Sequence, residues 1–326
     1  MNKQTPLSKI NYSGNLDQLL GRICASYGIG ELKDFFIIEV GYEDCNIMID
    51  TEKGKFLSKI FKKERSLEDI HRYVTIMEKT LEAGVNHPRL FYTANGEATY
   101  TDKVVNNINL VLMEFIEGKT FFELNRAPNS KERQEIISQA VKVNSINHHP
   151  PDLFDSWAIP NVCSMFERTK QFIESKDLKL VQKAIAKYEL IPVTKLPHCF
   201  VHGDFIKTNV MKTADAVYIL DFSVANWYPR IQELAVILAN LLHEGRTDML
   251  LEEKSEIVAG EYSRLSPLTL EERQYLPDYA LAGIAMQFMG SHQEKYINGN
   301  DTRETDYWLN LGREGLRREL MNDKNT

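Results

Sequence analysis

The sequence predicts an α+β protein of two lobes, with a small antiparallel β-sheet in the first lobe and mainly helices in the second. The first third of the 326 residues alternates apolar and polar positions and is rich in β-branched and aromatic residues. Beyond Gly118 a helical period dominates instead. Ligands often bind in the cleft between two such lobes, so we expect a binding site there.

The first lobe is expected to contain two helices and five strands. Antiparallel pairing is predicted at the turn over 52–55, which joins two neighbouring strand patterns. Gly84 ends the second helical pattern. The expected helices are 14–29 and 66–83, and the expected strands are 35–38, 47–49, 56–61, 89–93 and 108–115.

The second lobe is expected to be helical, with strands only between 198 and 222. We therefore expect a first lobe at 1–113, a short connector or hinge at 114–118, and a second lobe at 119–326. The expected helices of the second lobe are 130–148, 161–189, 230–243, 250–264, 270–290 and 303–321.

Composition narrows the function and the cellular setting. A net charge of −7 argues against nucleic-acid binding, which normally uses a basic face. The four cysteines show no CxxC pairing, a pattern typical of reduced cytosolic thiols. The N-terminus lacks the apolar core of a signal peptide, and no apolar run approaches the roughly 20 residues that span a bilayer. We expect a cytoplasmic protein with no membrane partner, and the oligomeric state is left open.

The most informative motif is His202-Gly203-Asp204 with Asn209 and, further along, Asp221. Apolar strands flank it on both sides. Phosphoryl transfer from a nucleotide needs one carboxylate to accept the proton of the attacking hydroxyl, and an amide and a second carboxylate to hold Mg²⁺. The motif therefore predicts a kinase that uses ATP and Mg²⁺, with Asp204 as base and Asn209 and Asp221 as metal ligands. A polar β-turn without catalytic function is the alternative.

These residues, followed by Ile219-Leu220-Asp221-Phe222, resemble the aminoglycoside phosphotransferase and choline kinase superfamily, the small-molecule branch of the protein-kinase-like fold. The resemblance covers most of the chain. It implies a bilobal kinase-like fold, a nucleotide-binding first lobe, and transfer of the γ-phosphate of ATP to a hydroxyl of a small molecule. No protein-kinase activation segment is present between 222 and 233, which also points to a small acceptor.

In the first lobe the resemblance assigns the adenine site to the hinge. Met113 would lie behind the base, and the Glu114 carbonyl and Ile116 N–H would bind its edge. Lys59 would contact the phosphates, and Leu57 would cover the adenine. Leu57 and Lys59 share one strand face, where a lysine among apolar neighbours is costly to bury unless it meets an anion. Extension of Lys59 to solvent is the alternative.

Further nucleotide contacts are expected from the resemblance alone. Glu78, on the helix over 66–83, would steady Lys59. Gly41 and Asn46 would lie in the loop that covers the phosphates. This loop has no G-x-G-x-x-G pattern, and its two acids, Glu43 and Asp44, would repel phosphate. Lys207 would face the transferring phosphate or, alternatively, point to solvent.

The sequence leaves open the identity of the acceptor substrate and the role of one acid near the catalytic motif. Glu233 matches an acid that braces the catalytic loop in the family. Choline, homoserine, an amino sugar and a thiosugar remain open as acceptors. A catalytically silent nucleotide-binding protein and a metal-dependent hydrolase are the competing functions. Candidate acceptor contacts are Trp227, Tyr228, Glu244, Tyr262, Gln287, His292 and Trp308.

Overall fold

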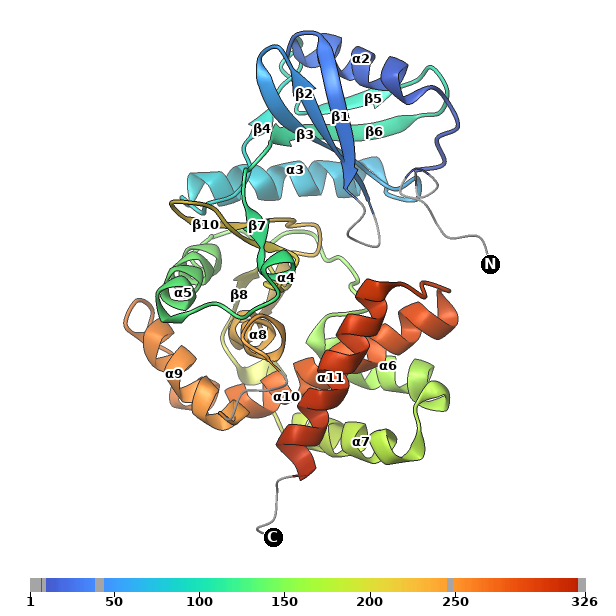
Figure 1. The fold of residues 1–326 in the computed structure, drawn as a ribbon. Helices are drawn as coiled ribbons and strands as arrows, with labels where there is room; N and C mark the ends of the chain where they lie inside the picture. Colours follow the sequence, from blue (N-terminus) through green and yellow to red (C-terminus); the bar gives the residue numbers. More distant parts are fainter. Residues whose placement is uncertain (1–6, 8–9, 39–43, 245–248, 322–326) are drawn as a thin grey trace. The chain divides into compact units, whose positions relative to one another are not determined.

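The computed structural model describes residues 7, 10–38, 44–244 and 249–321. The chain divides into two compact units, one of Met1–Glu82 with His87–Glu117 and one of Ala83–Asn86 with Gly118–Thr326. Figure 1 draws both units, coloured along the sequence.

The first unit is built on one antiparallel sheet in the order β1-β2-β3-β6-β4, with β5 also paired to β6. A tight turn joins β2 to β3: the Thr51 hydroxyl donates to the Ile29 carbonyl at 2.7 Å, and Gly54 has a φ of +125°. The strands are β1 (Leu32–Ile38), β2 (Cys45–Thr51), β3 (Gly54–Ile60), β4 (Leu90–Phe91), β5 (Thr99–Asp102) and β6 (Ile108–Glu114).

The two faces of this sheet differ. One face carries Ile47, Ile60 and Leu110, which pack with residues of helix α2 (Leu16–Tyr27) in a buried apolar cluster. Figure 1 shows α2 next to the strands of this sheet. Side chains alternate between faces along a strand, so Lys59 and Met113 lie on the opposite face. Helix α3 (Leu67–Glu82) supports that face: the Tyr73 hydroxyl reaches the Met113 sulfur at 3.8 Å.

The second unit is helical and is organised around α10. This helix is buried on nearly all sides from Leu276 to His292, as expected for a helix that other helices surround. Its neighbours include α6, α7, α8, α9 and α11. The helices are α4 (Phe121–Leu124), α5 (Ser130–Asn144), α6 (Val162–Thr169), α7 (Ser175–Glu189), α8 (Ile231–Val236), α9 (Leu251–Ser263), α10 (Leu270–His292) and α11 (Arg303–Met321).

Two small sheets in this unit position the His202–Asn209 segment, here called the catalytic loop. One sheet has the order β10-β9-β7 and the other pairs β8 with β11. The catalytic loop connects β8 to β9, and Asp221 follows β10. The strands are β7 (Lys119–Thr120), β8 (His198–Val201), β9 (Val210–Lys212), β10 (Val217–Ile219) and β11 (Asn226–Pro229).

The predicted α+β class is confirmed, with differences in detail. The expected helix over 161–189 is broken between α6 and α7, with Lys170–Phe172 forming a 3₁₀ turn. The helix over 230–243 becomes a π-helical turn at Ile237–Leu241. Strands β5, β7 and β11 were not expected. Each is short, and each is either polar or separated from the other strand patterns along the sequence. Within the described part of the chain, no helix has the length and apolar character to cross a membrane.

Candidate active site

Asp204 and Asn209 lie side by side in the catalytic loop. The Asn209 Nδ2 donates to Asp204 Oδ2 at 2.6 Å and to the Asp204 carbonyl oxygen at 3.2 Å. The N–H of Ile206 donates to the same carbonyl at 2.8 Å, which closes the loop as a tight turn. The amide of Asn209 therefore orients the carboxylate of the predicted base.

Asp221 is held beside this loop by backbone pairing. The N–H of Leu220 donates to the Asn209 carbonyl at 2.7 Å, so the next residue, Asp221, follows directly. Asp221 has a φ of +60°, a left-handed conformation that residues other than glycine seldom adopt. Its Oδ1 accepts hydrogen bonds from the Ser223 N–H at 3.2 Å and the Ser223 hydroxyl at 2.5 Å. Strained backbone of this kind often occurs at functional sites.

Glu233 and His202 brace the loop. Glu233, in the first turn of α8, accepts the N–H groups of His202 and Gly203, each at 2.9 Å, which confirms its expected role. Burial raises the pKa of Glu233 to about 7, although these two bonds lower it. The Asp204 N–H donates to His202 Nδ1 at 3.0 Å. The proton of His202 is therefore on Nε2, which donates to the Leu220 carbonyl at 2.9 Å.

Negative charge gathers around Asp204. Burial raises its pKa well above the ordinary value, and the charges of Asp155 and Asp221 raise the pKa further, while the hydrogen bond from Asn209 lowers it. The Asp155 Oδ1 accepts the Trp157 N–H at 2.8 Å, which fixes the carboxylate locally. Sequence reasoning missed Asp155, because no motif links that segment to the catalytic loop.

Asn209 and Asp221 fit a magnesium site. They supply an amide oxygen and a carboxylate, the hard oxygen donors that Mg²⁺ prefers. The Asn209 Nδ2 faces Asp204, so its oxygen is the atom left to act as a ligand. Among the described residues, no group of three or more His, Cys, Asp or Glu side chains could hold a metal ion. Two oxygen donors suit magnesium that also binds nucleotide phosphates.

In the first unit, the predicted phosphate-binding lysine is buried and paired. Lys59 is 2% exposed, and its Nζ lies 3.2 Å from Asp44 Oδ2 and 5.4 Å from the centre of the Tyr73 ring. The alternative in which Lys59 extends to solvent is therefore wrong. Arg65 Nη2 lies 3.5 Å from the same carboxylate oxygen. Asp44, expected from the sequence to repel phosphate, thus balances two cations.

Three other predicted residues of this unit, Asn46, Leu57 and Met113, share the face of Lys59. Asn46 lies opposite Lys59 across β2 and β3, and Leu57 lies opposite Met113 across β3 and β6. Directly opposite residues project to the same side of a sheet. Asn46, Leu57, Lys59 and Met113 therefore form one surface that ends at the hinge.

The predicted hinge residues Glu114 and Ile116 lie at and just beyond the end of β6. The N–H of Glu114 donates to the Arg89 carbonyl at 2.9 Å, and its carboxylate lies 3.1 Å from Arg89 Nε. The N–H of Glu114 is thus already used, which is compatible with the expectation that its carbonyl faces adenine. Ile116 lies beyond β6, half-buried and outside the strand ladder.

Two predicted nucleotide contacts are less well defined. Glu78 accepts a hydrogen bond from the Tyr92 hydroxyl at 2.9 Å, and Lys59 forms an ion pair with Asp44. The role of Glu78 stays a prediction. Gly41 lies outside the described residues.

Lys207 points into the helical unit. It is 2% exposed, so the alternative in which it points to solvent is wrong. Its Nζ donates to the His243 carbonyl at 2.8 Å and to the Tyr307 hydroxyl at 3.2 Å. Burial lowers the pKa of Lys207 to about 8, and the charge of Lys254 contributes to this lowering, while Glu244 opposes it. Its contact with phosphate stays a prediction.

Several acceptor candidates have structural roles. Gln287 accepts from Asn240 Nδ2 at 2.8 Å and donates to the Trp308 carbonyl at 3.3 Å. Tyr262 is fully buried and His292 is 3% exposed. Trp227 stacks on His149 with ring centres 4.6 Å apart. These contacts explain the positions of the four side chains without a bound substrate.

Comparison with known proteins identifies the family. The model of the phosphotransferase enzyme family matches residues 37–268, and the chain belongs to this family. A homoserine kinase of Caulobacter sp. (strain K31) is 22% identical over 319 residues, which cover 94% of this chain and 97% of that protein. A homoserine kinase of Phenylobacterium zucineum (strain HLK1) is 24% identical and covers 85% of this chain and 84% of its own.

Solved structures share the fold. A spectinomycin phosphotransferase in complex with ADP and spectinomycin superposes with a TM-score of 0.68 at 13% identity, covering 91% of this chain and 97% of that one. A microcompartment-associated aminopropanol kinase gives 0.64 at 11% identity, covering 92% and 95%. The fold is that of small-molecule kinases, which confirms the predicted resemblance. The protein is an ATP-dependent phosphotransferase with an alcohol group of a small molecule as acceptor.

Proposed function

We propose that this kinase uses Mg²⁺ and ATP to phosphorylate a small amino-bearing alcohol, with homoserine as the first candidate. Relatives that carry the name homoserine kinase match nearly the whole chain, which supports this acceptor. The observation that carries the catalytic assignment is the 2.6 Å hydrogen bond that joins Asn209 to Asp204, next to Asp221.

In the second unit, Asp204 would accept the proton of the acceptor hydroxyl. The bond from Asn209 orients its carboxylate, and burial keeps it basic enough for this task. Asn209 and Asp221 would hold Mg²⁺, which neutralises phosphate charge when it is bound. Asp155, whose charge reaches Asp204, is suited to attract the ammonium group of an amino alcohol.

In the first unit, the face that carries Lys59 would bind the nucleotide. Leu57 and Met113 would contact the adenine ring, and the Glu114 carbonyl and Ile116 N–H would bind its edge. Lys59 would exchange its partner Asp44 for the phosphates. Asn46, directly opposite Lys59 in the sheet, would contribute a polar contact.

Three further assignments carry less structural support. Glu78 would steady Lys59, Gly41 would allow the loop to approach phosphate, and Lys207 would add positive charge near the transferred group. The four cysteines are free thiols, which suits the reducing cytoplasm as the site of action.

The test is ADP release with Mg²⁺ and ATP across homoserine, aminopropanol, ethanolamine, choline and spectinomycin. We expect a homoserine-dependent signal that Asp204→Asn lowers about 10²- to 10⁴-fold while nucleotide binding is retained. Asp215→Asn, at an exposed acid between β9 and β10, is the matched control and should keep full activity.

Two results would contradict the proposal in different ways. Full activity of the Asp204→Asn protein would show that Asp204 is not the base. ATP binding without transfer to any acceptor would favour the silent nucleotide-binding protein.

A further inference from the structure

A cavity lies in the helical unit, and the residues assigned to phosphoryl transfer are not part of its lining. Its volume is about 290 Å³, just below the range of about 300–1,000 Å³ that is usual for sites of drug-sized molecules. It is lined by the C-terminal end of α5, the start of β8, the residue before α8 and the end of α9. Asp204, Asn209 and Asp221 are not among its lining residues.

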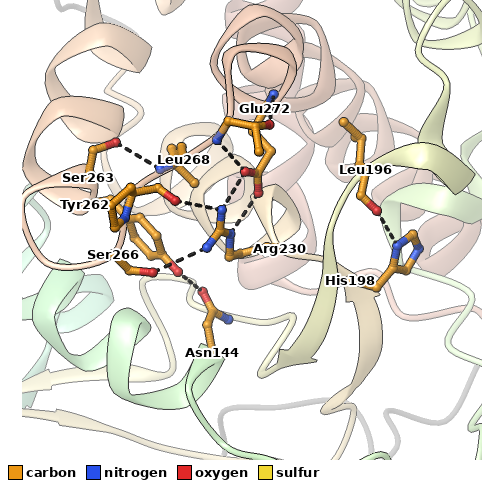
Figure 2. A network of polar contacts seen from close by, with 11 residues as sticks. Asn144, Leu196, His198, Arg230, Tyr262, Ser263, Ser266, Leu268 and Glu272 are labelled. Carbon is orange, nitrogen blue, oxygen red and sulfur yellow. Dashed lines mark hydrogen bonds and ion pairs between the residues drawn. The ribbon is translucent and has the colours of Figure 1, made fainter.

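Arg230 is the charged group of this cavity and is fixed in place. Its Nε and Nη2 bind the two oxygens of Glu272 at 2.8 and 2.5 Å, and its Nη1 reaches Ser266 Oγ at 3.3 Å (Figure 2). Nη2 also donates to the Pro267 carbonyl at 3.0 Å. A guanidinium has five N–H donors, so one N–H on Nη1 remains for a ligand.

The other polar groups of the cavity can accept hydrogen bonds. His198 Nδ1 lies 2.7 Å from the Leu196 carbonyl, which can only accept, so Nδ1 carries a proton and Nε2 is the ring nitrogen left to accept a hydrogen bond (Figure 2). The Ser145 hydroxyl donates to the Lys142 carbonyl at 2.7 Å, so its oxygen can accept from a ligand. The cavity therefore offers a charged donor at Arg230 and acceptors at His198 and Ser145.

Charge balance limits the kind of ligand. The buried carboxylate of Glu272 already neutralises Arg230, so the cavity is close to neutral overall and does not favour a phosphate. A single carboxylate can still share an arginine that another acid holds in place, because the guanidinium presents several donors. A zwitterion, with a carboxylate for Arg230 and an ammonium for His198 and Ser145, matches both the charge and the donor pattern.

The walls of the cavity are connected to the catalytic loop by two short routes. Cys199 belongs to β8, which runs directly into His202. Arg230 immediately precedes α8, whose Glu233 accepts the N–H groups of His202 and Gly203. The Arg230 N–H also donates to the Pro197 carbonyl at 2.8 Å, so the two routes are joined.

A third contact strengthens this connection. The Tyr262 hydroxyl donates to Asn144 Oδ1 at 2.9 Å (Figure 2). Asn144 Nδ2 donates to the Phe200 carbonyl at 3.0 Å. Helices α5 and α9 are thereby tied to the strand that leads into the catalytic loop. A ligand that contacts these walls would bias the position of the loop through packed and hydrogen-bonded groups.

We propose that this cavity is a regulatory site for a small α-amino acid, whose carboxylate binds Arg230 and whose ammonium binds His198 and Ser145. The effect of this amino acid on turnover rests on the proposed function, whereas its binding to the cavity does not. The proposed function and the proposed binding site can therefore be disproved separately.

Cys199 allows binding to be measured inside the cavity. Its thiol is half-buried, and burial raises its pKa to about 12, so alkylation is slow and sensitive to shielding. Cys163, on α6 and not among the lining residues, is the internal reference. The experiment follows iodoacetamide labelling of both cysteines by peptide mass spectrometry, with each proteinogenic L-α-amino acid at millimolar concentration.

We expect at least one amino acid to slow labelling of Cys199 and leave Cys163 unchanged. The same amino acid should slow amide hydrogen exchange of His202 and Gly203 and change kcat about fivefold or more. Ser145→Phe should abolish all three effects by blocking the cavity. Ser130→Phe, at the exposed opposite end of the same helix, should preserve them.

Three results would overturn the proposal. One is labelling of Cys199 that no amino acid slows. Another is protection that persists in a folded Ser145→Phe protein, since the ligand would then bind elsewhere. The third is protection of Cys199 with unchanged amide exchange at His202 and Gly203, which would show that the site is not coupled to the catalytic loop. If no acceptor supports turnover, labelling and exchange still decide the proposal.

Discussion

At the scale of single residues, Asp204 is surrounded by acids from distant parts of the sequence. Asp155 and Asp221 both raise its pKa, in addition to burial. As the proposed base, Asp204 must be deprotonated to act, so activity should fall as the pH drops through this raised pKa. Each neighbouring charge therefore sets where the acidic limb of the pH profile lies.

Asp155→Asn should lower the pKa of Asp204 and move the acidic limb of kcat to lower pH. The KM for an amino-bearing acceptor should rise, because its ammonium loses a charged partner. The measurement is kcat and KM against pH with saturating nucleotide. Asp152→Asn, at a nearby exposed acid, should leave both unchanged. An acidic limb that stays in place in Asp155→Asn would disprove the electrostatic coupling.

Asp44 provides a test in the other unit. Asp44→Asn leaves Lys59 and Arg65 without this carboxylate, and breaking a buried ion pair typically costs about 3–5 kcal/mol. Without nucleotide, the Tm should therefore fall. ATP would resupply negative charge, so the rise in Tm on adding ATP should be larger than in the unchanged protein. Glu52→Gln, in the exposed β2–β3 turn, is the control, and an equal rise in Tm for Asp44→Asn would contradict a phosphate role for Lys59.

At the scale of secondary-structure elements, α8 holds the catalytic loop through one side chain. Glu233→Gln keeps the size of Glu233 but replaces one acceptor oxygen by an NH₂ group, which cannot accept the N–H of His202 or Gly203. Hydrogen bonds to charged groups contribute about 1.5–3 kcal/mol, so kcat should fall about 10- to 100-fold. The KM for ATP should change little.

Steady-state kinetics measures the effect of Glu233→Gln. Glu271→Gln, on an exposed face at the start of α10, is the control. An unchanged kcat for Glu233→Gln would show that the bond to α8 does not position the loop.

The elements that could be predicted from sequence are those with a strong local pattern. The strand with Lys59 alternates clearly, and α3 repeats its apolar residues at helical spacing, so both were expected near their observed positions. The break between α6 and α7 is different, because Ile173 and Glu174 have extended backbones where the local pattern of the sequence predicts a helix. Strand β11 exists only because it pairs with β8.

At the scale of the whole molecule, each unit contains a histidine that folding keeps neutral. Burial lowers the pKa of His87 to about 4. Burial and the charges of Lys254, Lys207 and Arg318 lower the pKa of His243 to about 3. Both folded values lie below the ordinary value of 6.5, so the unfolded chain takes up protons first as the pH falls. Each histidine therefore reduces stability below about pH 6.5.

For His243 the expected loss is about 1.4 kcal/mol between roughly pH 7.5 and pH 5.5. Urea unfolding at both pH values measures the free energy of unfolding. His243→Gln should reduce the loss by this amount, whatever its effect at neutral pH. His71→Gln, at an exposed site, should retain the full loss. An equal pH dependence in His243→Gln and the unchanged protein would disprove the assignment.

The sequence revealed the site only where its residues are close along the chain. Asp204 and Asn209 belong to one loop, and a short strand connects them to Asp221. The pairing of Lys59 with Asp44 and the approach of Asp155 to Asp204 depend on how the chain folds back. No spacing in the sequence encodes those contacts, so they required coordinates.

The tight turn between β2 and β3 has a consequence for how genes of this kind can change in length. Side chains alternate along both strands, so a change in the length of this turn that shifted the pairing of β3 by one residue would exchange its two faces. Lys59 would then enter the apolar cluster under α2, and Ile60 would take its place on the opposite face. Natural length variation at Thr51–Gly54 should therefore be confined to changes that keep the pairing of β2 with β3.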